Sequence, residues 1–158
     1  MFDLWSEASL RVVFAARFEA GSVGCPLIDT EHLLLGMVRV DPASVRAIGA
    51  AVSIEQIKTR AQEWHVDGKS IPTFEDLATT DDLARVFEHA TSEAKAAGCH
   101  VVRTEHVLFA LMSETGCHAA AILEERGGGL ENARSLLRSV DGSTGQASME
   151  FDPPFTFD

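Results

Sequence analysis

Two short blocks of the sequence carry the side chains best suited to chemistry, and the blocks are identical. Thr30-Glu31-His32 and Thr104-Glu105-His106 each place a carboxylate between a hydroxyl and an imidazole, immediately before a run of apolar residues. A carboxylate in the first turn of a helix has a simple role, because the helix dipole favours negative charge there. Two exposed carboxylates at equivalent positions could also bind a cationic ligand in a common groove. Both interpretations stay open, and we expect Glu31 and Glu105 to face solvent.

The two blocks belong to a longer internal repeat, offset by 74 residues from Thr30 to Thr104. Gly24-Cys25 corresponds to Gly98-Cys99, and further on Ile54-Glu55 corresponds to Leu130-Glu131 with the offset increased to 76. A repeat of this length indicates one structural unit used twice. In each unit a nearly continuous apolar run follows the block, which predicts a buried helix capped by the Thr, with only its N-terminus at the surface.

The spacing of apolar residues predicts an all-α fold with eight main helices. The expected helices cover residues 4–20, 30–39, a short stretch from 41, 53–64, 83–97, a stretch from 104, 117–125 and 130–138. The first helix should bury a stripe formed by Leu10, Val13, Phe14 and Phe18. The expected division is a first repeat over 1–64, a connector over 65–79, a second repeat over 80–140 and a flexible acidic and aromatic tail over 141–158.

Composition limits the possible partners. The 158 residues include 24 acidic and 13 basic side chains, which gives a formal net charge of −11. This argues against nucleic acid and against an anionic membrane surface, because both bind basic faces. Three cysteines, an N-terminus without a secretory signal and the absence of a long apolar run predict a cytoplasmic protein with reduced thiols.

Motifs for common enzyme chemistry are absent from the sequence. There is no phosphate-binding G-x-x-x-x-G-K-[ST], no G-x-S-x-G and no H-E-x-x-H. Cys25 and His32 recur as Cys99 and His106, but this spacing is not that of a structural zinc site, and no C-x-x-C occurs. We therefore interpret the cysteines as buried structural thiols and expect no catalytic residue, no metal and no cofactor.

The doubled Thr-Glu-His block, preceded by a Gly-containing loop, resembles the duplicated N-terminal domain of Clp AAA+ unfoldases, and that of the C-type unfoldases in particular. The opening Met1-Phe2 and the connector Ile71-Pro72-Thr73-Phe74 are similar too, so that the resemblance covers about residues 1–140. Cys25 and Cys99 stand where the family has a loop His. The resemblance implies two tandem four-helix repeats related by pseudo-twofold symmetry, in a Clp N-domain that stands alone, without the ATPase rings.

In the C-type relatives the Glu of each block holds the guanidinium of phosphorylated arginine, and helix N-termini help to hold the phosphate. By this resemblance, the ligand-binding residues are Thr30, Glu31, His32, Arg103, Thr104, Glu105 and His106. Asp29 and Arg103 replace the Gly that the family usually has before the Thr. Because Asp29 should repel a phosphate and Arg103 should attract one, we expect the Glu105 site to accept phosphoarginine better than the Glu31 site.

The resemblance implies a non-enzymatic module that binds proteins or peptides. It would recognise substrates, degrons or adaptors and modulate Clp-dependent protein degradation, and its partners could include Clp unfoldase or protease subunits. Two other functions stay open. The protein could be an accessory subunit that docks on a Clp protease core, or a protein that sequesters a small molecule such as an antibiotic.

The end of the chain has a composition of its own. Phe151, Phe155 and Phe157 lie among acidic residues around Pro153-Pro154. Each Phe is costly to leave in water, and the prolines lower the entropy of an extended segment. Residues 149–158 are therefore predicted to dock in an apolar groove of their own domain or of a partner. The alternative is a disordered end whose aromatic residues have no function.

Overall fold

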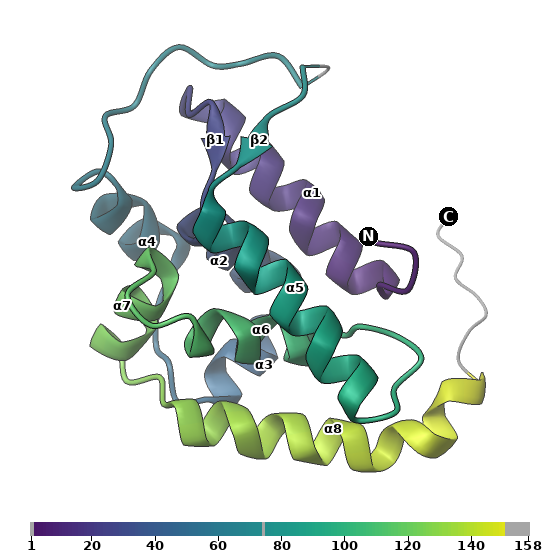
Figure 1. Cartoon of the computed structure of the whole chain (residues 1–158). Coiled ribbons are helices and arrows are strands. Elements are labelled where there is room, and N and C mark those ends of the chain that lie inside the picture. The colour runs from purple at the N-terminus through teal and green to yellow at the C-terminus, as the bar shows by residue number, and fades with distance from the viewer. Residues whose placement is uncertain (1, 74, 151–158) are drawn as a thin grey trace.

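The computed structural model describes residues 2–73 and 75–150, with side chains as far as Asp141. Within these residues the chain forms eight helices and two strands of two residues each, which confirms the all-α prediction (Figure 1). The first repeat contains α1 (Glu7–Ser22), α2 (Thr30–Val40), α3 (Pro42–Ala47) and α4 (Ile54–Ala61). The second contains α5 (Asp81–Ala96), α6 (Thr104–Ser113), α7 (His118–Glu125) and α8 (Leu130–Glu150).

The two repeats are related by pseudo-twofold symmetry, which is visible in how each pairs with the other. Strand β1 (Leu27–Ile28) runs parallel to β2 (Ala78–Thr79), with Ile28 opposite Thr79. An isolated parallel bridge joins Trp5 to Val102. Trp5 and Thr79 are equivalent under the 74-residue offset, and so are Ile28 and Val102. The segment before each first helix therefore pairs with the loop of the opposite repeat, which makes the two units one body.

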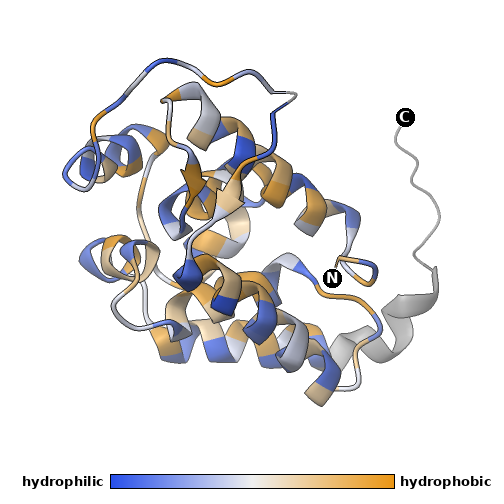
Figure 2. Cartoon of the chain, turned by 45° about the horizontal axis from the view of Figure 1, so that its top comes forward, coloured by the Kyte–Doolittle hydropathy of each residue, from blue (hydrophilic) through white to orange (hydrophobic). Residues whose placement is uncertain are grey.

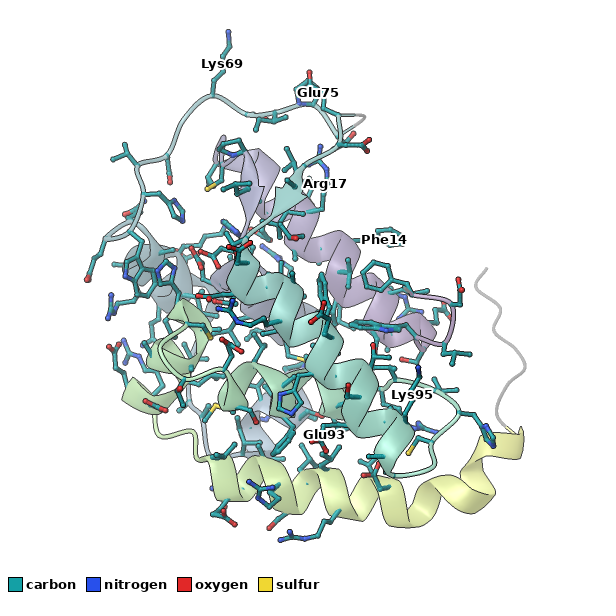
Figure 3. All side chains as sticks on the ribbon, viewed as in Figure 1. Phe14, Arg17, Lys69, Glu75, Glu93 and Lys95 are labelled. Carbon is teal, nitrogen blue, oxygen red and sulfur yellow. The ribbon has the colours of Figure 1, made fainter. Side chains whose placement is uncertain are left out.

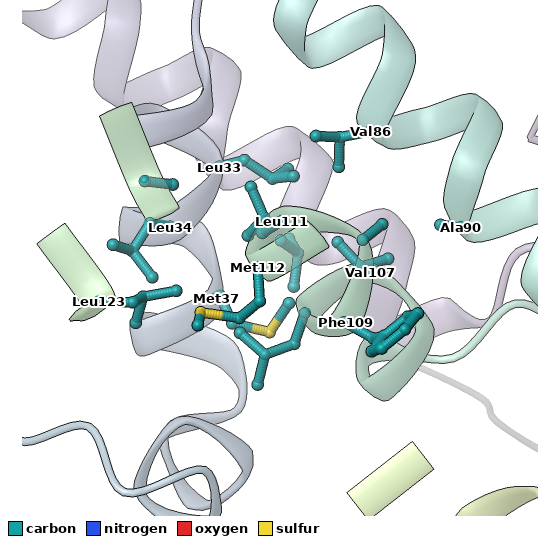
Figure 4. Packing of buried hydrophobic residues seen from close by; sticks show 14 of the residues in the cluster. Leu33, Leu34, Met37, Val86, Ala90, Val107, Phe109, Leu111, Met112 and Leu123 are labelled. Carbon is teal, nitrogen blue, oxygen red and sulfur yellow. The ribbon is translucent and has the colours of Figure 1, made fainter. Parts of the chain in front are cut away.

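Helices α2 and α6 form the centre of the core. Their largest fully buried side chains include Leu33, Leu34, Met37, Leu108, Leu111 and Met112 (Figure 4). The helices around them alternate hydrophilic and hydrophobic residues along their length, as expected of helices with one face in the core (Figure 2). Helix α1 crosses α2 closely at Gly36, where an added Cβ would collide with the carbonyl oxygen of Val12.

Within the described residues, no single helix has the length and apolar composition needed to cross a membrane. Helices α6 and α7 reach that composition only when taken together, and the two are bent by 93° relative to each other.

The N-cap of α2 is not the Thr that the sequence predicted. Asp29 is the N-cap of α2, and Thr30 is its first helical residue. The Asp29 side chain accepts from Thr30 N–H at 2.7 Å, and His32 Nδ1 accepts from Asp29 N–H at 2.9 Å. His106 Nδ1 likewise accepts from Arg103 N–H at 2.9 Å. The His of each block thus has a structural role, because it closes the first turn of its helix.

Two sequence predictions about the outer helices need correction. In α1 the fully buried apolar residues are Val12, Ala16 and Ala20. Of the predicted stripe, Leu10 and Val13 are partly buried against the core, while Phe14 and Phe18 are exposed. Helix α8 continues to Glu150 instead of ending near residue 138. An isolated Gly is tolerated in a helix at a cost of about 1 kcal/mol, and Asp141 is tied to the body by His106. The predicted docking of the aromatic tail concerns residues 149–158, and all three of its Phe residues lie in 151–158, outside the described residues.

Candidate functional site

The Thr-Glu-His block of the first repeat lies at the N-terminus of α2, and the structure closes it off from solvent. Thr30, Glu31 and His32 are all buried, and the Glu31 side chain is 0% exposed. The prediction that Glu31 faces solvent is therefore wrong. The sequence showed the N-terminus of the helix as a polar end, but it could not show that α7 and the start of the connector cover that end.

The buried Glu31 carboxylate lies between two histidines from distant parts of the chain. His65, just after α4, places Nε2 3.0 Å from Glu31 Oε2. His118, the first residue of α7, places Nδ1 3.0 Å from Glu31 Oε1 and 3.4 Å from Asp29 Oδ2. Asp29 is itself held by Thr80, whose hydroxyl donates to Oδ1 at 2.8 Å. Each carboxylate oxygen of Glu31 thus has a hydrogen-bond partner, as a buried charge requires.

A stack of side chains covers this cluster and joins the two repeats. The Trp64 and His118 rings are parallel within 2°, with centroids 3.8 Å apart. The Arg60 guanidinium lies 4.4 Å from the centroid of the Trp64 ring. Arg60 also forms a two-pronged ion pair with Glu125 of α7, at 3.1 and 2.9 Å. No local sequence pattern marks these residues, because the contacts join positions more than fifty residues apart.

The second block differs from the first in its surroundings. Glu105 and Arg103 are half-buried, whereas Thr104 and His106 are buried. The Thr104 hydroxyl donates to Asp41 Oδ2 at 2.6 Å. Glu105 and Glu31 therefore do not line a common open groove, because only Glu105 reaches the surface.

An apolar groove lies between α1, α5 and the connector, and we call it the α1–α5 groove. It has a volume of about 550 Å³, and its apolar lining includes Phe2, Val13, Phe14, Ile28, Leu77 and Phe87. The Phe14 side chain is 70% exposed. Arg17 holds the connector against α1 by donating to the carbonyl oxygens of Pro72, at 2.8 Å, and Glu75 (Figure 3). The connector thus forms one wall of the groove.

Cys117 has the properties expected of a buried structural thiol. Burial raises the pKa of the Cys117 thiol above its ordinary value. Burial is also the main cause that raises the pKa of Cys25, followed by the charge of Glu31. A thiol with a raised pKa is protonated and a weak nucleophile at neutral pH.

The fold is an all-helical body of two repeats with an apolar groove between α1, α5 and the connector. Residues 6–126 match the Clp repeat (R) N-terminal domain family. The chain belongs to this family, as the doubled block indicated.

Named relatives agree with this assignment. The chain is 29% identical over 143 residues to the negative regulator of genetic competence ClpC/MecB of Bacillus subtilis, a match that covers 90% of this chain and 18% of that protein. It is 29% identical over 143 residues to the chaperone protein ClpB of Oceanobacillus iheyensis, with the same coverage. The chain therefore spans less than a fifth of the length of these relatives.

A solved structure has the same fold. The N-terminal domain of the Clp-associated chaperone ClpD from Arabidopsis thaliana superposes with a TM-score of 0.71 at 23% identity. The superposition covers 87% of this chain and 99% of that domain.

Proposed function

We propose that this chain is a non-enzymatic module that binds segments of other proteins and modulates Clp-dependent protein degradation. The observation that supports this proposal is the α1–α5 groove, with the exposed ring of Phe14 at its edge. A large aromatic side chain is costly to leave in water, and an apolar groove of this size suits the apolar side chains of a substrate, degron or adaptor.

The groove can be tested with a fluorescein-labelled, permanently unfolded model protein such as reduced and carboxymethylated α-lactalbumin. We expect Phe14→Ala to weaken binding about tenfold or more, as for an aromatic side chain that makes a large apolar contact with its partner. Phe18→Ala is the matched control, because Phe18 is a similarly exposed ring one turn further along α1 that does not line the groove. Equal affinity of the two variants would refute binding in this groove.

The parent and the Phe14→Ala variant can also identify the class of partner. Pull-down from a cell extract followed by mass spectrometry, carried out with the parent and with Phe14→Ala, separates adaptor-like binding from docking on a protease core. Many unrelated proteins lost together in the variant would support substrate or degron recognition. Clp ring or protease subunits recovered equally with both proteins would instead support the accessory-subunit function.

Phosphoarginine is proposed as a ligand of the second block only. Glu31 is closed off by His65 and His118, whereas Glu105 is half-buried beside Arg103. A guanidinium can approach Glu105 without displacing a buried hydrogen bond, and Arg103 can attract the phosphate. Calorimetry with phosphoarginine should therefore show loss of binding in Glu105→Ala and little change in Glu31→Gln. Equal loss in both variants, or no binding to the parent, would refute this asymmetry.

A further inference from the structure

The Cys-His pair of each repeat meets a third side chain, and the two repeats differ at that position. Under the offset of 76 that relates α4 to α8, His65 corresponds to Asp141. In the second repeat Asp141 Oδ1 accepts from His106 Nε2–H at 2.9 Å and from the Cys99 thiol at 3.1 Å. In the first repeat an imidazole takes the place of that carboxylate, beside Cys25 and His32.

This difference leaves two ring nitrogens of the first repeat without hydrogen-bond partners among the described residues. His32 is 2% exposed, and its Nδ1 accepts from Asp29 N–H, so the neutral ring carries its proton on Nε2. That Nε2–H is buried and unpartnered. His65 donates Nε2–H to Glu31, which leaves a lone pair on Nδ1, and this atom is buried and unpartnered too. Buried polar atoms without partners are rare in native proteins and point to something that is bound there.

The unpartnered atoms gather around a thiol. One ligand atom from each of Cys25, His32 and His65 lies within 4.8 Å of the other two. A cavity of about 130 Å³ adjoins them, lined by both histidines and by polar residues that include Glu19, Lys58, Gln62 and Asp67. The cavity gives room for water molecules beside the cluster.

The electrostatic potential around the thiol suits a cation. After burial, the causes that raise the pKa of Cys25 are the charges of Glu31, Asp29 and Asp67. Negative charge that disfavours a bare thiolate stabilises a thiolate bound to a metal cation, because the cation reverses the sign of the interaction. Glu19 lies further along the same cavity and is already paired with Arg39 and Lys58.

We propose that Cys25 and His65 bind a thiophilic divalent transition-metal ion such as Zn²⁺. The ligands are the Cys25 thiolate and His65 Nδ1, and water completes a tetrahedral shell. His32 is a positioning residue: its Nε2–H donates to the coordinated sulfur, since its other nitrogen is occupied by the cap of α2. On binding, the thiol loses its proton to solvent and its sulfur forms the bond to the metal, with no change of oxidation state.

The surroundings support His65 as a ligand. His65 Nε2–H donates to the wholly buried Glu31 carboxylate, and this hydrogen bond fixes the orientation of the ring. Carboxylate–histidine–metal triads have the same arrangement. The site would join the loop before α2 to the connector, where Gly68 N–H already donates to Val23 O at 2.6 Å. The sequence could not predict this site, because His65 lies forty residues from Cys25 and outside any metal-binding spacing.

Titration of the reduced protein with Co²⁺ tests the proposal, because a cobalt-bound thiolate gives a near-ultraviolet charge-transfer band. We expect saturation at about one ion per chain, displacement by Zn²⁺, and release of about one proton per ion in calorimetry. Cys25→Ser should abolish the band, and His65→Gln, which can still donate to Glu31, should weaken binding about tenfold or more.

Cys99→Ser is the matched control, since it removes the equivalent thiol of the second repeat, and it should leave the affinity within about twofold of the parent. Circular dichroism establishes that each variant is folded. The proposal is wrong if the parent gives no charge-transfer band, if Cys99→Ser loses as much affinity as Cys25→Ser, or if His65→Gln binds as tightly as the parent. His65 lies after α4 and is partly exposed, so its variant keeps the test decisive even where Cys25→Ser fails to fold.

Discussion

Replacing Glu31 by Ala should destabilise the fold far more than the same replacement of Glu105, although the two residues hold equivalent positions in the repeat. Glu31 is wholly buried and accepts hydrogen bonds from His65 and His118 at 3.0 Å each. Glu105 is half-buried, and among the described residues it accepts a long hydrogen bond from the Thr104 hydroxyl at 3.4 Å. The helix dipole acts on both carboxylates alike, so its contribution cancels in the comparison.

The magnitude follows from the contacts that are lost. A hydrogen bond to a charged group contributes about 1.5–3 kcal/mol, and breaking a buried pair costs about 3–5 kcal/mol. Because His65 and His118 are 23% and 30% exposed, water can reach the rings once the carboxylate is gone. We therefore expect Glu31→Ala to lower the free energy of unfolding by about 3 kcal/mol, near the lower limit of that range. Glu105→Ala should cost about 1 kcal/mol or less.

Urea denaturation at neutral pH, followed by far-ultraviolet circular dichroism, measures both changes. The slope with denaturant should stay the same in the variants, so that the midpoint reports stability. Trp64 fluorescence gives a second signal, because the ring stacks on His118 and its environment changes when His118 loses its carboxylate partner. Equal losses for the two variants, or a loss below about 1 kcal/mol for Glu31→Ala, would contradict the reasoning from burial.

Two further predictions concern the core and its pH dependence. Leu34→Ala and Leu108→Ala each remove a wholly buried side chain from a central helix, and each should cost about 2–5 kcal/mol in the same denaturation experiment. A cost below about 1 kcal/mol would contradict the burial of these two side chains. Burial lowers the pKa of His32 below its ordinary value of 6.5, so the unfolded chain takes up a proton that the folded chain does not. The free energy of unfolding should therefore fall as the pH drops below 6.5. His32 contributes at most about 1.36 kcal/mol per pH unit to this fall, until the pH reaches its lowered pKa. In His32→Gln the free energy of unfolding should change less steeply with pH, and an unchanged pH dependence would exclude His32 as its source.

The sequence by itself determined the number and order of the helices, the repeat and the family. Local signals were sufficient for this, because caps such as Asp41 and Ser53 and the long apolar runs act within a few residues of the chain. The internal offset also predicted two equivalent units, and the bridges of Trp5 to Val102 and Ile28 to Thr79 follow the same equivalence.

Only the tertiary structure decided what surrounds each block. Identical Thr-Glu-His sequences end in different environments, because the side chains that cover Glu31 come from α7 and from the connector. The third side chain beside each Cys-His pair was decided in the same way. In the second repeat Asp141 accepts from His106, whereas in the first repeat His65 stands at the equivalent place and two ring nitrogens have no partner among the described residues. Burial and hydrogen bonding depend on residues far apart in the chain, and no local pattern encodes which of them will meet. Helix propensity and caps therefore determined the elements, and packing between the repeats determined which polar groups are buried and which reach the surface.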